Sequence, residues 1–196
     1  MIDLEILLKN GGDIKKYSKQ ELIFKESEHA KYYFQIIEGS VRMYNSNPEG
    51  KEFTQGYFGN SESFGEPPLI IDEPYPANAQ AMVDSSIIRI NKINFIDLLK
   101  GRQDITLKFL SVLSLRIYKK SITSRDLINH NPEQRILSLL ENYKYSQNSN
   151  GYKVLIPYTR QEIANFTGLR VETVIRTISK LNKRGILTIE NKKVMF

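Results

Sequence analysis

Short runs of aromatic and β-branched residues, separated by turn residues, fill the first half of the chain. The Glu38-Gly39-Ser40 turn separates two of these runs, and the polar segment 45–50 is typical of a hairpin connection. Turn signals about every 8–12 residues favour a sandwich or roll. We therefore predict an antiparallel β-roll from about residue 22 to residue 90. The predicted strand runs are 32–37, 41–44, 53–58 and 79–90.

Two segments at the edges of this pattern do not read as central strands. Residues 1–15 indicate a short helix or a loose lead-in. The prolines of 67–76 exclude a central strand, because proline lacks the N–H that a sheet ladder needs. We expect a loop or a short helix there.

The hydrophobic period changes near Ile93, where apolar residues begin to recur at spacings of three and four. We predict a helix around Phe95 and a longer one at about 104–128. Three of the seven residues on one face of the longer helix are serine, so the face would be a weak coiled-coil seam. Either this face packs on the chain's own roll, or it forms a dimer seam. The seven residues are Leu107, Leu110, Ser114, Ile117, Ser121, Ser124 and Ile128.

A proline opens the last third of the chain. Pro132 fits the first position of a helix that continues to about Tyr145. We place the domain boundary at about residue 129. The predicted domains are 1–128, with the roll and the long helix, and 129–196.

The sequence 158–196 carries the strongest motif. Thr159 and Glu162 match a capping box, in which each side chain satisfies a free backbone N–H of the other residue. Gly168 provides a turn with positive φ. A second helix is predicted from about Val171 to Arg184, followed by a hairpin over 186–196.

Glycine and apolar spacing define this second helix further. Gly185 is its predicted C-cap. Val174, Ile178 and Leu181 share one face, which we expect to be buried. Helix, turn, helix and hairpin in this order predict a winged helix-turn-helix. The opposite face of the second helix is predicted to be exposed, and it carries Val171, Glu172, Ile175, Arg176 and Ser179.

The exposed face has the chemistry of major-groove reading. Arg176 can donate two hydrogen bonds to guanine, and Glu172 can accept one from cytosine. Residues at the start of the preceding helix suit phosphate contacts. The alternative is that Glu172 and Arg176 merely form a surface ion pair four residues apart. The candidate DNA-contacting residues are Thr159, Arg160, Gln161, Arg170, Val171, Glu172, Thr173, Ile175 and Arg176.

Charge supports this interpretation. Residues 1–128 hold 17 Lys+Arg and 17 Asp+Glu, whereas 129–196 hold 11 against 5, so the whole net charge of +6 lies in the last third. Such a segment is either a solvated basic surface or a surface that meets a polyanion such as nucleic acid. No stretch is apolar enough for a membrane span, and the acidic N-terminus is unlike a secretory signal, so we expect a cytoplasmic protein.

At this point the sequence resembles the Crp/Fnr family of bacterial transcription regulators over nearly its whole length. The helix-turn-helix signature is carried by 159–163, Gly168 and 171–176. The Val-Glu-Thr-x-x-Arg form is more similar to the Fnr branch than to the Crp branch, which has arginine where Val171 stands. In the N-terminal part, 22–26, 37–41 and Gly65-Glu66 resemble the cyclic-nucleotide-binding roll.

The resemblance implies an α+β fold with an N-terminal antiparallel jelly roll of the cyclic-nucleotide-binding type, a long dimerisation helix and a C-terminal winged helix-turn-helix. It also implies a homodimer that pairs through 104–128 and binds palindromic double-stranded DNA. Similarity to the Fnr branch suggests a half-site like TTGA, read mainly by Glu172 and Arg176. RNA polymerase is a candidate further partner.

The effector pocket departs from the family pattern. The family uses a Gly-Glu pair for the ribose and a downstream Arg-Ser for the cyclic phosphate. Gly65-Glu66 is present, but Tyr75-Pro76 stands at the Arg-Ser position and supplies no charge. A buried phosphate without a cation is costly, so we do not expect cyclic AMP to bind. Candidate pocket residues are Phe64, Gly65, Glu66, Tyr75, Pro76, Ala77, Lys120 and Ser121, the last two near the family's base contact.

Composition argues against the other cofactors of the family. With no cysteine, a cysteine-ligated iron–sulfur cluster is not expected. His29 and His130 read as surface histidines rather than haem ligands, and two histidines leave no cluster for a metalloenzyme on the roll. We identify no cofactor and no enzyme activity, and an unknown small-molecule effector stays open. The competing function is a nucleotide- or small-ligand-binding signalling module that acts through a protein partner.

Overall fold

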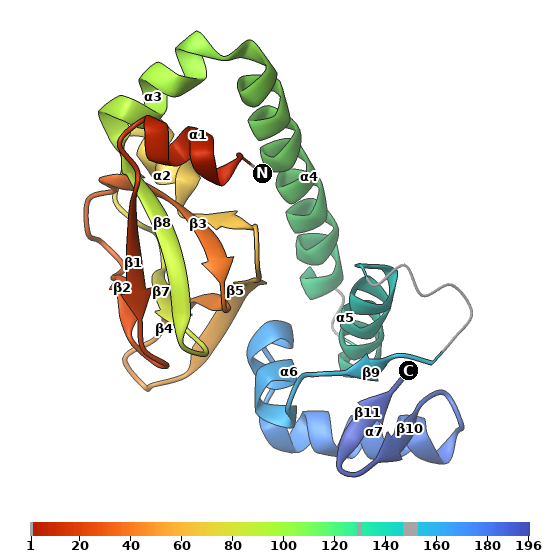
Figure 1. Ribbon diagram of the computed structural model, residues 1–196. Coiled ribbons are helices and arrows are strands. Elements are labelled where there is room, and N and C mark those ends of the chain that lie inside the picture. The colour runs from red at the N-terminus through yellow and green to blue at the C-terminus, as the bar shows by residue number, and fades with distance from the viewer. Residues whose placement is uncertain (1, 129–130, 147–152) are drawn as a thin grey trace. The chain divides into compact units, whose positions relative to one another are not determined.

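The chain forms a mixed α+β structure with two compact units, Met1–Arg116 and Ile117–Phe196 (Figure 1). The computed structural model describes residues 2–128, 131–146 and 153–196, and the side chains of these residues other than 123–128 and 146. The units divide inside helix α4 (Gln103–Ile128), whereas the predicted domain boundary follows this helix. The first half of α4 belongs with the roll, and its second half belongs to the C-terminal unit.

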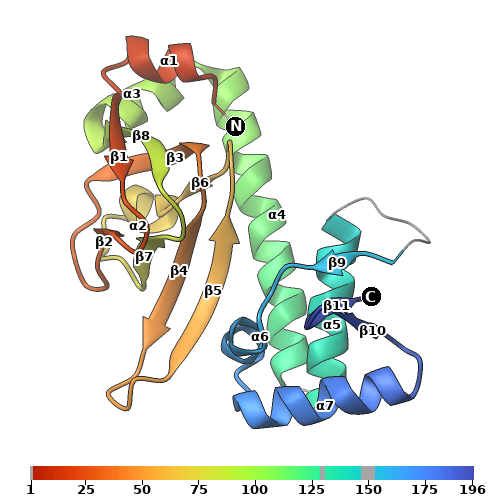
Figure 2. The same ribbon diagram turned by 60° about the horizontal axis from the view of Figure 1, so that its bottom comes forward.

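The first unit is an antiparallel roll of two four-stranded sheets. The strand orders are β1-β8-β3-β6 and β2-β7-β4-β5. Helices α1 and α3 lie at the same end of the roll in both views (Figures 1 and 2). The predicted roll is confirmed. Besides the start of α4, the elements are α1 (Leu4–Lys9), β1 (Asp13–Tyr17), β2 (Leu22–Phe24), β3 (Tyr32–Glu38), β4 (Val41–Ser46), β5 (Glu52–Phe58), β6 (Ser63–Phe64), α2 (Glu66–Ile71), β7 (Asn78–Ala81), β8 (Ser85–Asn91) and α3 (Lys92–Gly101).

Aromatic residues fill the core of the roll. The ring of Tyr33 on β3 stacks on Phe95 of α3, with ring centroids 4.3 Å apart, and Phe109 of α4 meets both rings edge-on. Tyr33 and Phe95 are almost completely buried. These contacts fix α3 and the first turns of α4 against the sheet, because stacked and edge-to-face rings add to the gain from buried apolar area.

One strand of the roll was not predicted. Residues 13–17 overlap the end of the segment 1–15 that was expected to be a helix or lead-in. They form strand β1 and pair with β8 from Asp13 opposite Arg89 to Tyr17 opposite Ser85. Only Tyr17 of β1 is buried, so the strand shows no apolar alternation that a sequence pattern could reveal. Its backbone pairing at the sheet edge holds it in place, assisted by the Asp13–Arg89 ion pair.

The proline-rich segment and the long helix agree with their predictions. Helix α2 occupies the start of 67–76, and α4 begins at Gln103, next to the expected start. Leu107, Leu110 and Ile117 of the predicted seam are 58%, 58% and 67% exposed. At Leu107 and Leu110, which lie in the first unit, the seam therefore does not pack on the roll. The side chains of Ser124 and Ile128 lie outside the described residues.

The second unit, apart from the end of α4, is a three-helix bundle with a small sheet. Helix α7 lies across the lower ends of α5 and α6 in both views (Figures 1 and 2). The sheet has the order β10-β11-β9, and its apolar side joins the helices in one core that includes Ile136, Ile163 and Val194. The elements are α5 (Pro132–Ser146), β9 (Leu155–Ile156), α6 (Arg160–Thr167), α7 (Val171–Lys183), β10 (Thr188–Glu190) and β11 (Lys193–Met195).

The end of α7 differs by one residue from the prediction. Arg184 is the C-cap, and Gly185 follows it with φ of 72°. The N–H of Gly185 donates to the carbonyl of Asn182, and the N–H of Ile186 donates to that of Leu181. This is a Schellman motif, in which the left-handed glycine lies one position beyond the cap. Gly185 therefore helps to end the helix as predicted, but it lies one residue beyond the C-cap.

No helix among the described residues is both long enough and apolar enough to cross a lipid bilayer.

Candidate nucleic-acid interface and effector pocket

A reciprocal cap fixes the start of α6. The backbone N–H of Glu162 donates to the Thr159 hydroxyl (3.1 Å), and the N–H of Thr159 donates to the Glu162 carboxylate (2.7 Å). The predicted capping box is therefore present. The ring of Tyr158, just before the cap, packs on Phe166 at 5.0 Å and on Tyr143 at 5.3 Å. Burial raises the pKa of Tyr158 to about 12, so its hydroxyl stays neutral in this contact.

The turn between α6 and α7 is short and tied to α5. Gly168 adopts φ of 66°, as the sequence predicts, and α7 begins three residues later at Val171. The Arg135 guanidinium of α5 donates to the carbonyl of Thr167, at the end of α6 (3.2 Å). The Gly168 turn and the hydrogen bond from Arg135 to Thr167 together set the direction of α7 relative to α6.

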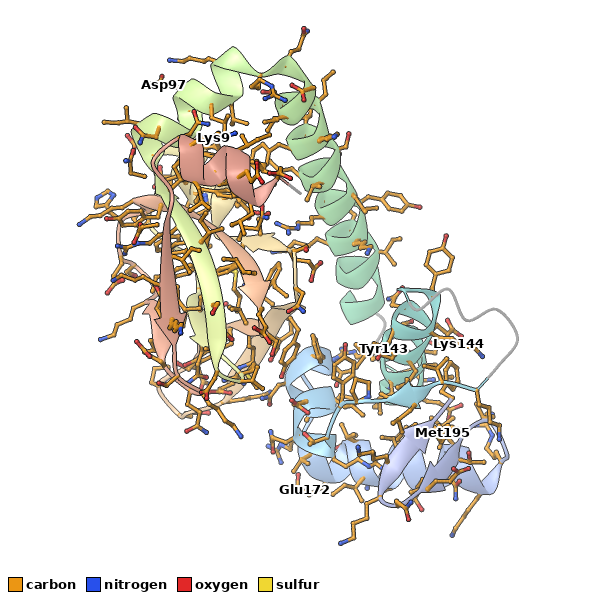
Figure 3. All side chains as sticks on the ribbon, in the orientation of Figure 1. Lys9, Asp97, Tyr143, Lys144, Glu172 and Met195 are labelled. Carbon is orange, nitrogen blue, oxygen red and sulfur yellow. The ribbon has the colours of Figure 1, made fainter. Side chains whose placement is uncertain are left out.

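Helix α7 has one buried and one exposed face. Val174, Ile178 and Leu181 are at most 1% exposed, as predicted. On the other side, Glu172 and Arg176 are exposed, and Ile175 between them is 52% exposed. Glu172 stands at the N-terminal end of the helix (Figure 3). The first two turns of α7 therefore present charged side chains that do not take part in the core.

The candidate contact residues gather at the starts of α6 and α7. No ion pair joins Glu172 and Arg176 within the part of the chain that the structure describes, so the alternative of a mere surface pair has no support in the geometry. Burial lowers the pKa of Arg160, which stays charged as arginine does. Arg160, Val171 and Thr173 are half-buried, whereas Thr159, Gln161, Arg170, Glu172, Ile175 and Arg176 are exposed.

Two of these side chains already have protein partners. The Gln161 amide donates to Asn165, one turn further along α6 (2.9 Å), and the Thr159 hydroxyl accepts from the cap. The Thr159 hydroxyl proton and the second N–H of the Gln161 amide can donate to a phosphate, and the Gln161 carbonyl can accept from a bridging water. At the far end of α7, Lys180 and Arg184 pair with Glu133 of α5.

The second candidate site surrounds Gly65-Glu66 in the roll. The Glu66 side chain is 1% exposed and accepts two hydrogen bonds from Nη1 of Arg116 on α4, at 2.9 and 3.0 Å. Nη2 of Arg116 donates to the Ser63 carbonyl at 2.6 Å, and the guanidinium lies 5.2 Å from the centre of the Phe58 ring. The carboxylate that the family directs at a ribose is thus bound by a side chain of the same chain.

Aromatic rings fill the space beside this ion pair. Tyr75 is 3% exposed and stacks on Phe24, with ring centroids 3.7 Å apart and planes 10° from parallel. Phe24 in turn packs on Phe34 and Phe64. A Cβ at Gly65 would lie 3.0 Å from the Phe24 ring, so the turn and the ring are in close contact. Burial raises the pKa of Tyr75 to about 12, and the phenol offers no charge to an anion.

The remaining predicted pocket residues lie in different environments. Phe64 and Ala77 are buried, whereas Pro76 is exposed and its carbonyl accepts from Asn45 (2.6 Å). Lys120 and Ser121 belong to the second unit and are exposed there.

Neither Arg116 as the partner of Glu66 nor Phe24 as the partner of Tyr75 was predicted from the sequence. Arg116 lies on the face of α4 that also carries Phe109 and Val112, and this shared face was a signal that could have indicated a contact with the roll. Phe24 gave no such signal, because its partner Tyr75 lies far away in the sequence.

The residues that the structure describes form no cluster suited to bind a metal ion. They contain no group of three or more histidines, aspartates or glutamates that could hold a metal ion. His29 is exposed, as predicted, beside its bridge to Pro74. His130 lies outside the described residues.

Two family models match the chain. One, described as "Cyclic nucleotide-binding domain", covers residues 14–102, and the other, described as "Crp-like helix-turn-helix domain", covers residues 134–195. The first corresponds to the roll and α3, and the second to most of the C-terminal unit.

Characterised relatives match over nearly the full length. An anaerobic regulatory protein of Bacillus subtilis is 27% identical over 192 residues, which cover 96% of this chain and 81% of the relative. A CRP-like cAMP-activated global transcriptional regulator of Mycobacterium tuberculosis is 24% identical over 91% of this chain and 81% of the relative.

A solved structure has the same fold. The c-di-GMP-responsive global regulator CLP of Xanthomonas campestris superimposes with a TM-score of 0.82 at 22% identity, over 98% of this chain and 97% of that one. FixK2 of Bradyrhizobium japonicum gives a TM-score of 0.77 at 21% identity, over 94% and 92%.

The Glu66–Arg116 ion pair gives the first test. Arg116→Gln would leave the buried Glu66 carboxylate without a cation, and we expect the free energy of unfolding to fall by about 3 kcal/mol. Urea denaturation followed by circular dichroism measures the change. Arg102→Gln, which breaks the exposed pair with Asp104, is the matched control and should leave the free energy of unfolding nearly unchanged. The double variant Glu66→Gln/Arg116→Gln should regain part of the loss. Equal stability of Arg116→Gln and Arg102→Gln would contradict the role given to this pair.

Proposed function

Because the chain belongs to the Crp/Fnr family of transcription regulators, we propose that it reads a palindromic DNA site with the exposed face of α7 from each half of a homodimer. It is a DNA-binding transcription regulator rather than an enzyme. We propose in turn how the protein recognises DNA, how it forms a dimer, and that it does not need cyclic AMP.

The two-faced helix α7 carries the proposal. Its buried face anchors it to α5 and α6, and its exposed first turns bear Glu172, Ile175 and Arg176. An α-helix fits the major groove, where arginine binds guanine through two hydrogen bonds and a carboxylate accepts from cytosine. The apolar Ile175 side chain suits contact with a thymine methyl group. These three side chains would therefore read bases.

Contacts to the backbone would come from α6. The Thr159 hydroxyl and the Gln161 amide lie at its N-terminus, where free N–H groups and the helix dipole favour a phosphate. The net charge of +6 in 129–196 supplies the general attraction to DNA. Thr159, Arg160, Gln161, Arg170 and Thr173 are proposed to position the protein rather than to select sequence.

The outer face of α4 supports a homodimer. Leu107, Leu110 and Ile117 are more than half exposed, although they recur at helical spacing. Apolar side chains in such a row are typical of a face that a second helix covers. Two copies paired through this seam would present two α7 helices about 34 Å apart, which fits half-sites one helical turn apart.

We further propose that DNA binding does not require cyclic AMP. Arg116 neutralises Glu66, and Tyr75 stands where the family has its phosphate-binding arginine. The Tyr75–Phe24 stack occupies space beside Gly65 that a nucleotide would need. Effectors differ among the similar proteins, since one is named for cAMP and another for c-di-GMP.

Selection from random duplex DNA tests the proposed reading. We expect a two-fold symmetric consensus, with affinity that falls steeply as salt is added, because counterions are released at each phosphate contact. Arg176→Ala should weaken binding to that consensus by about 1–3 kcal/mol per half-site and relax the sequence preference, as measured by fluorescence anisotropy.

Two variants control this experiment. Arg176→Lys keeps the charge but loses the two-pronged hydrogen bond, so it should still lose selectivity. Arg102→Ala removes the same side chain from the roll and should leave both affinity and selectivity unchanged. An asymmetric consensus, or full selectivity in Arg176→Ala, would refute the proposed reading.

Dimerisation is tested on the seam itself. Leu110→Glu should place a charge in the pairing face and give a monomer in sedimentation experiments. Leu115→Glu is the matched control, because Leu115 is also an exposed leucine of α4 (54%) but lies off the seam. A wild-type monomer, or a Leu110→Glu dimer as stable as the wild type, would contradict the proposal.

Calorimetry with cyclic AMP tests the claim about the effector. We expect no heat of binding at micromolar concentrations and the same affinity for DNA with and without the nucleotide. Micromolar binding would mean that the stacked rings and the ion pair move aside, and the proposal would be wrong.

A further inference from the structure

The first unit has a hollow that lies away from Gly65-Glu66. It has a volume of about 350 Å³ and opens between the N-terminal segment and the first turns of α4. Both ribbon views show the N-terminal end of the described chain beside this part of α4 (Figures 1 and 2). Neither Gly65, Glu66 nor Tyr75 lines it. A volume at the lower end of the usual range for ligand sites suits a small molecule.

The wall from the N-terminal segment is fixed by an internal clamp. The amide of Gln35 donates to the Ile2 carbonyl at 2.8 Å, and its oxygen accepts from the Ile2 N–H at 3.3 Å. The Tyr33 hydroxyl donates to the same oxygen at 2.9 Å. Gln35 is 6% exposed. The hollow is therefore bounded by an ordered segment, which reduces the entropy that a ligand would have to offset.

The inner surface combines apolar walls with a polar floor. Ile2 and Ile6 face it from the N-terminal segment and α1, and Ile105, Phe109 and Val112 face it from α4. The floor contains two deeply buried polar side chains, Tyr33 (1% exposed) and Ser63 (2% exposed). Such a surface suits an apolar body that carries one polar group.

The charges at the rim leave one cation without an ion-pair partner. Arg102 and Asp104 neutralise each other through two hydrogen bonds of 2.9 Å, and the guanidinium lowers the pKa of Asp104 to about 2. The Asp3 carboxylate accepts from the N–H of Glu5 (2.8 Å) as the cap of α1. Lys108 is exposed and takes part in none of the ion pairs found among the described residues.

We propose that this hollow binds a small amphipathic monoanion, such as a medium-chain carboxylate. The hydrocarbon part lies between α1 and α4, and the carboxylate meets the Lys108 ammonium at the rim. Apolar burial supplies most of the affinity, because the hydrocarbon part leaves water. The lysine selects an anion over a neutral molecule of the same shape.

The site lies on the side of α4 opposite the proposed dimer seam. At 100° per residue, Ile105, Phe109 and Val112 share one face, and Leu107 and Leu110 lie on the other. A bound ligand would thus contact the inner face of the helix whose outer face pairs with a second copy. An effect of the ligand on DNA binding rests on the function proposed above, whereas binding of the ligand does not.

Titration calorimetry without DNA tests the site, with octanoate below its micellar concentration as the probe. We expect binding to the wild-type chain and no binding to Val112→Trp, in which the indole fills the hollow. Lys108→Gln should weaken octanoate about fivefold and leave octanamide unchanged, in line with the small value of an exposed ion pair. Lys16→Gln, on β1 and away from the hollow, is the matched control and should bind as the wild type does.

The outcomes separate this inference from the proposed function. No binding of octanoate by the wild type overturns the site, and so does equal binding by wild type, Val112→Trp and Lys108→Gln. Lys108→Gln keeps the test decisive if Val112→Trp does not fold. DNA affinity of the wild type and of the same variants, measured without ligand, reports on the proposed function alone, whereas octanoate binding measured without DNA reports on the site alone.

Discussion

The attachment of α4 to the roll depends on one buried carboxylate. Glu66 is 1% exposed, and burial of a carboxylate without a cation is costly. Arg116 pairs with it and also donates to the Ser63 carbonyl. The guanidinium binds β6 and α2 to the middle of α4, while the Tyr33–Phe95–Phe109 rings bind its first turns. Polar and aromatic contacts together orient the inner face of the helix. The outer face stays exposed at Leu107 and Leu110, and this division of faces underlies both the proposed assembly and the proposed ligand site.

In the C-terminal unit, the shorter helix α7 likewise has one face in the core and one face exposed. Val174, Ile178 and Leu181 hold α7 in the core, so its other face is free to carry charge. The cap at Thr159, the turn at Gly168 and the Schellman motif at its end are local devices that fix where each helix begins and ends. The side chains proposed to recognise DNA lie outside the core, and they can differ while the scaffold is kept.

Local and periodic features could be predicted from the sequence, and pairings between distant segments could not. The capping box, the apolar face of α7 and the length of α4 follow from spacing within one element, and each was found. Strand β1 was missed because four of its five residues are exposed, and only its pairing with β8 makes it a strand. The contact of Glu66 with Arg116 spans 50 positions, and the face that Arg116 shares with Phe109 and Val112 indicates a contact with the roll but not the partner. Tyr75 was expected to supply no charge, but its stacking on Phe24 depends on the fold of the whole roll.

The opposed faces of α4 have a consequence for how such proteins diverge. Because successive residues turn by 100°, each position between 105 and 116 serves either the roll or the outer surface, and few serve both. If the proposed ligand site and dimer seam hold, substitutions on the inner side can change the choice of small molecule without disturbing the seam. Residues on the two faces of α4 can thus be substituted independently of each other.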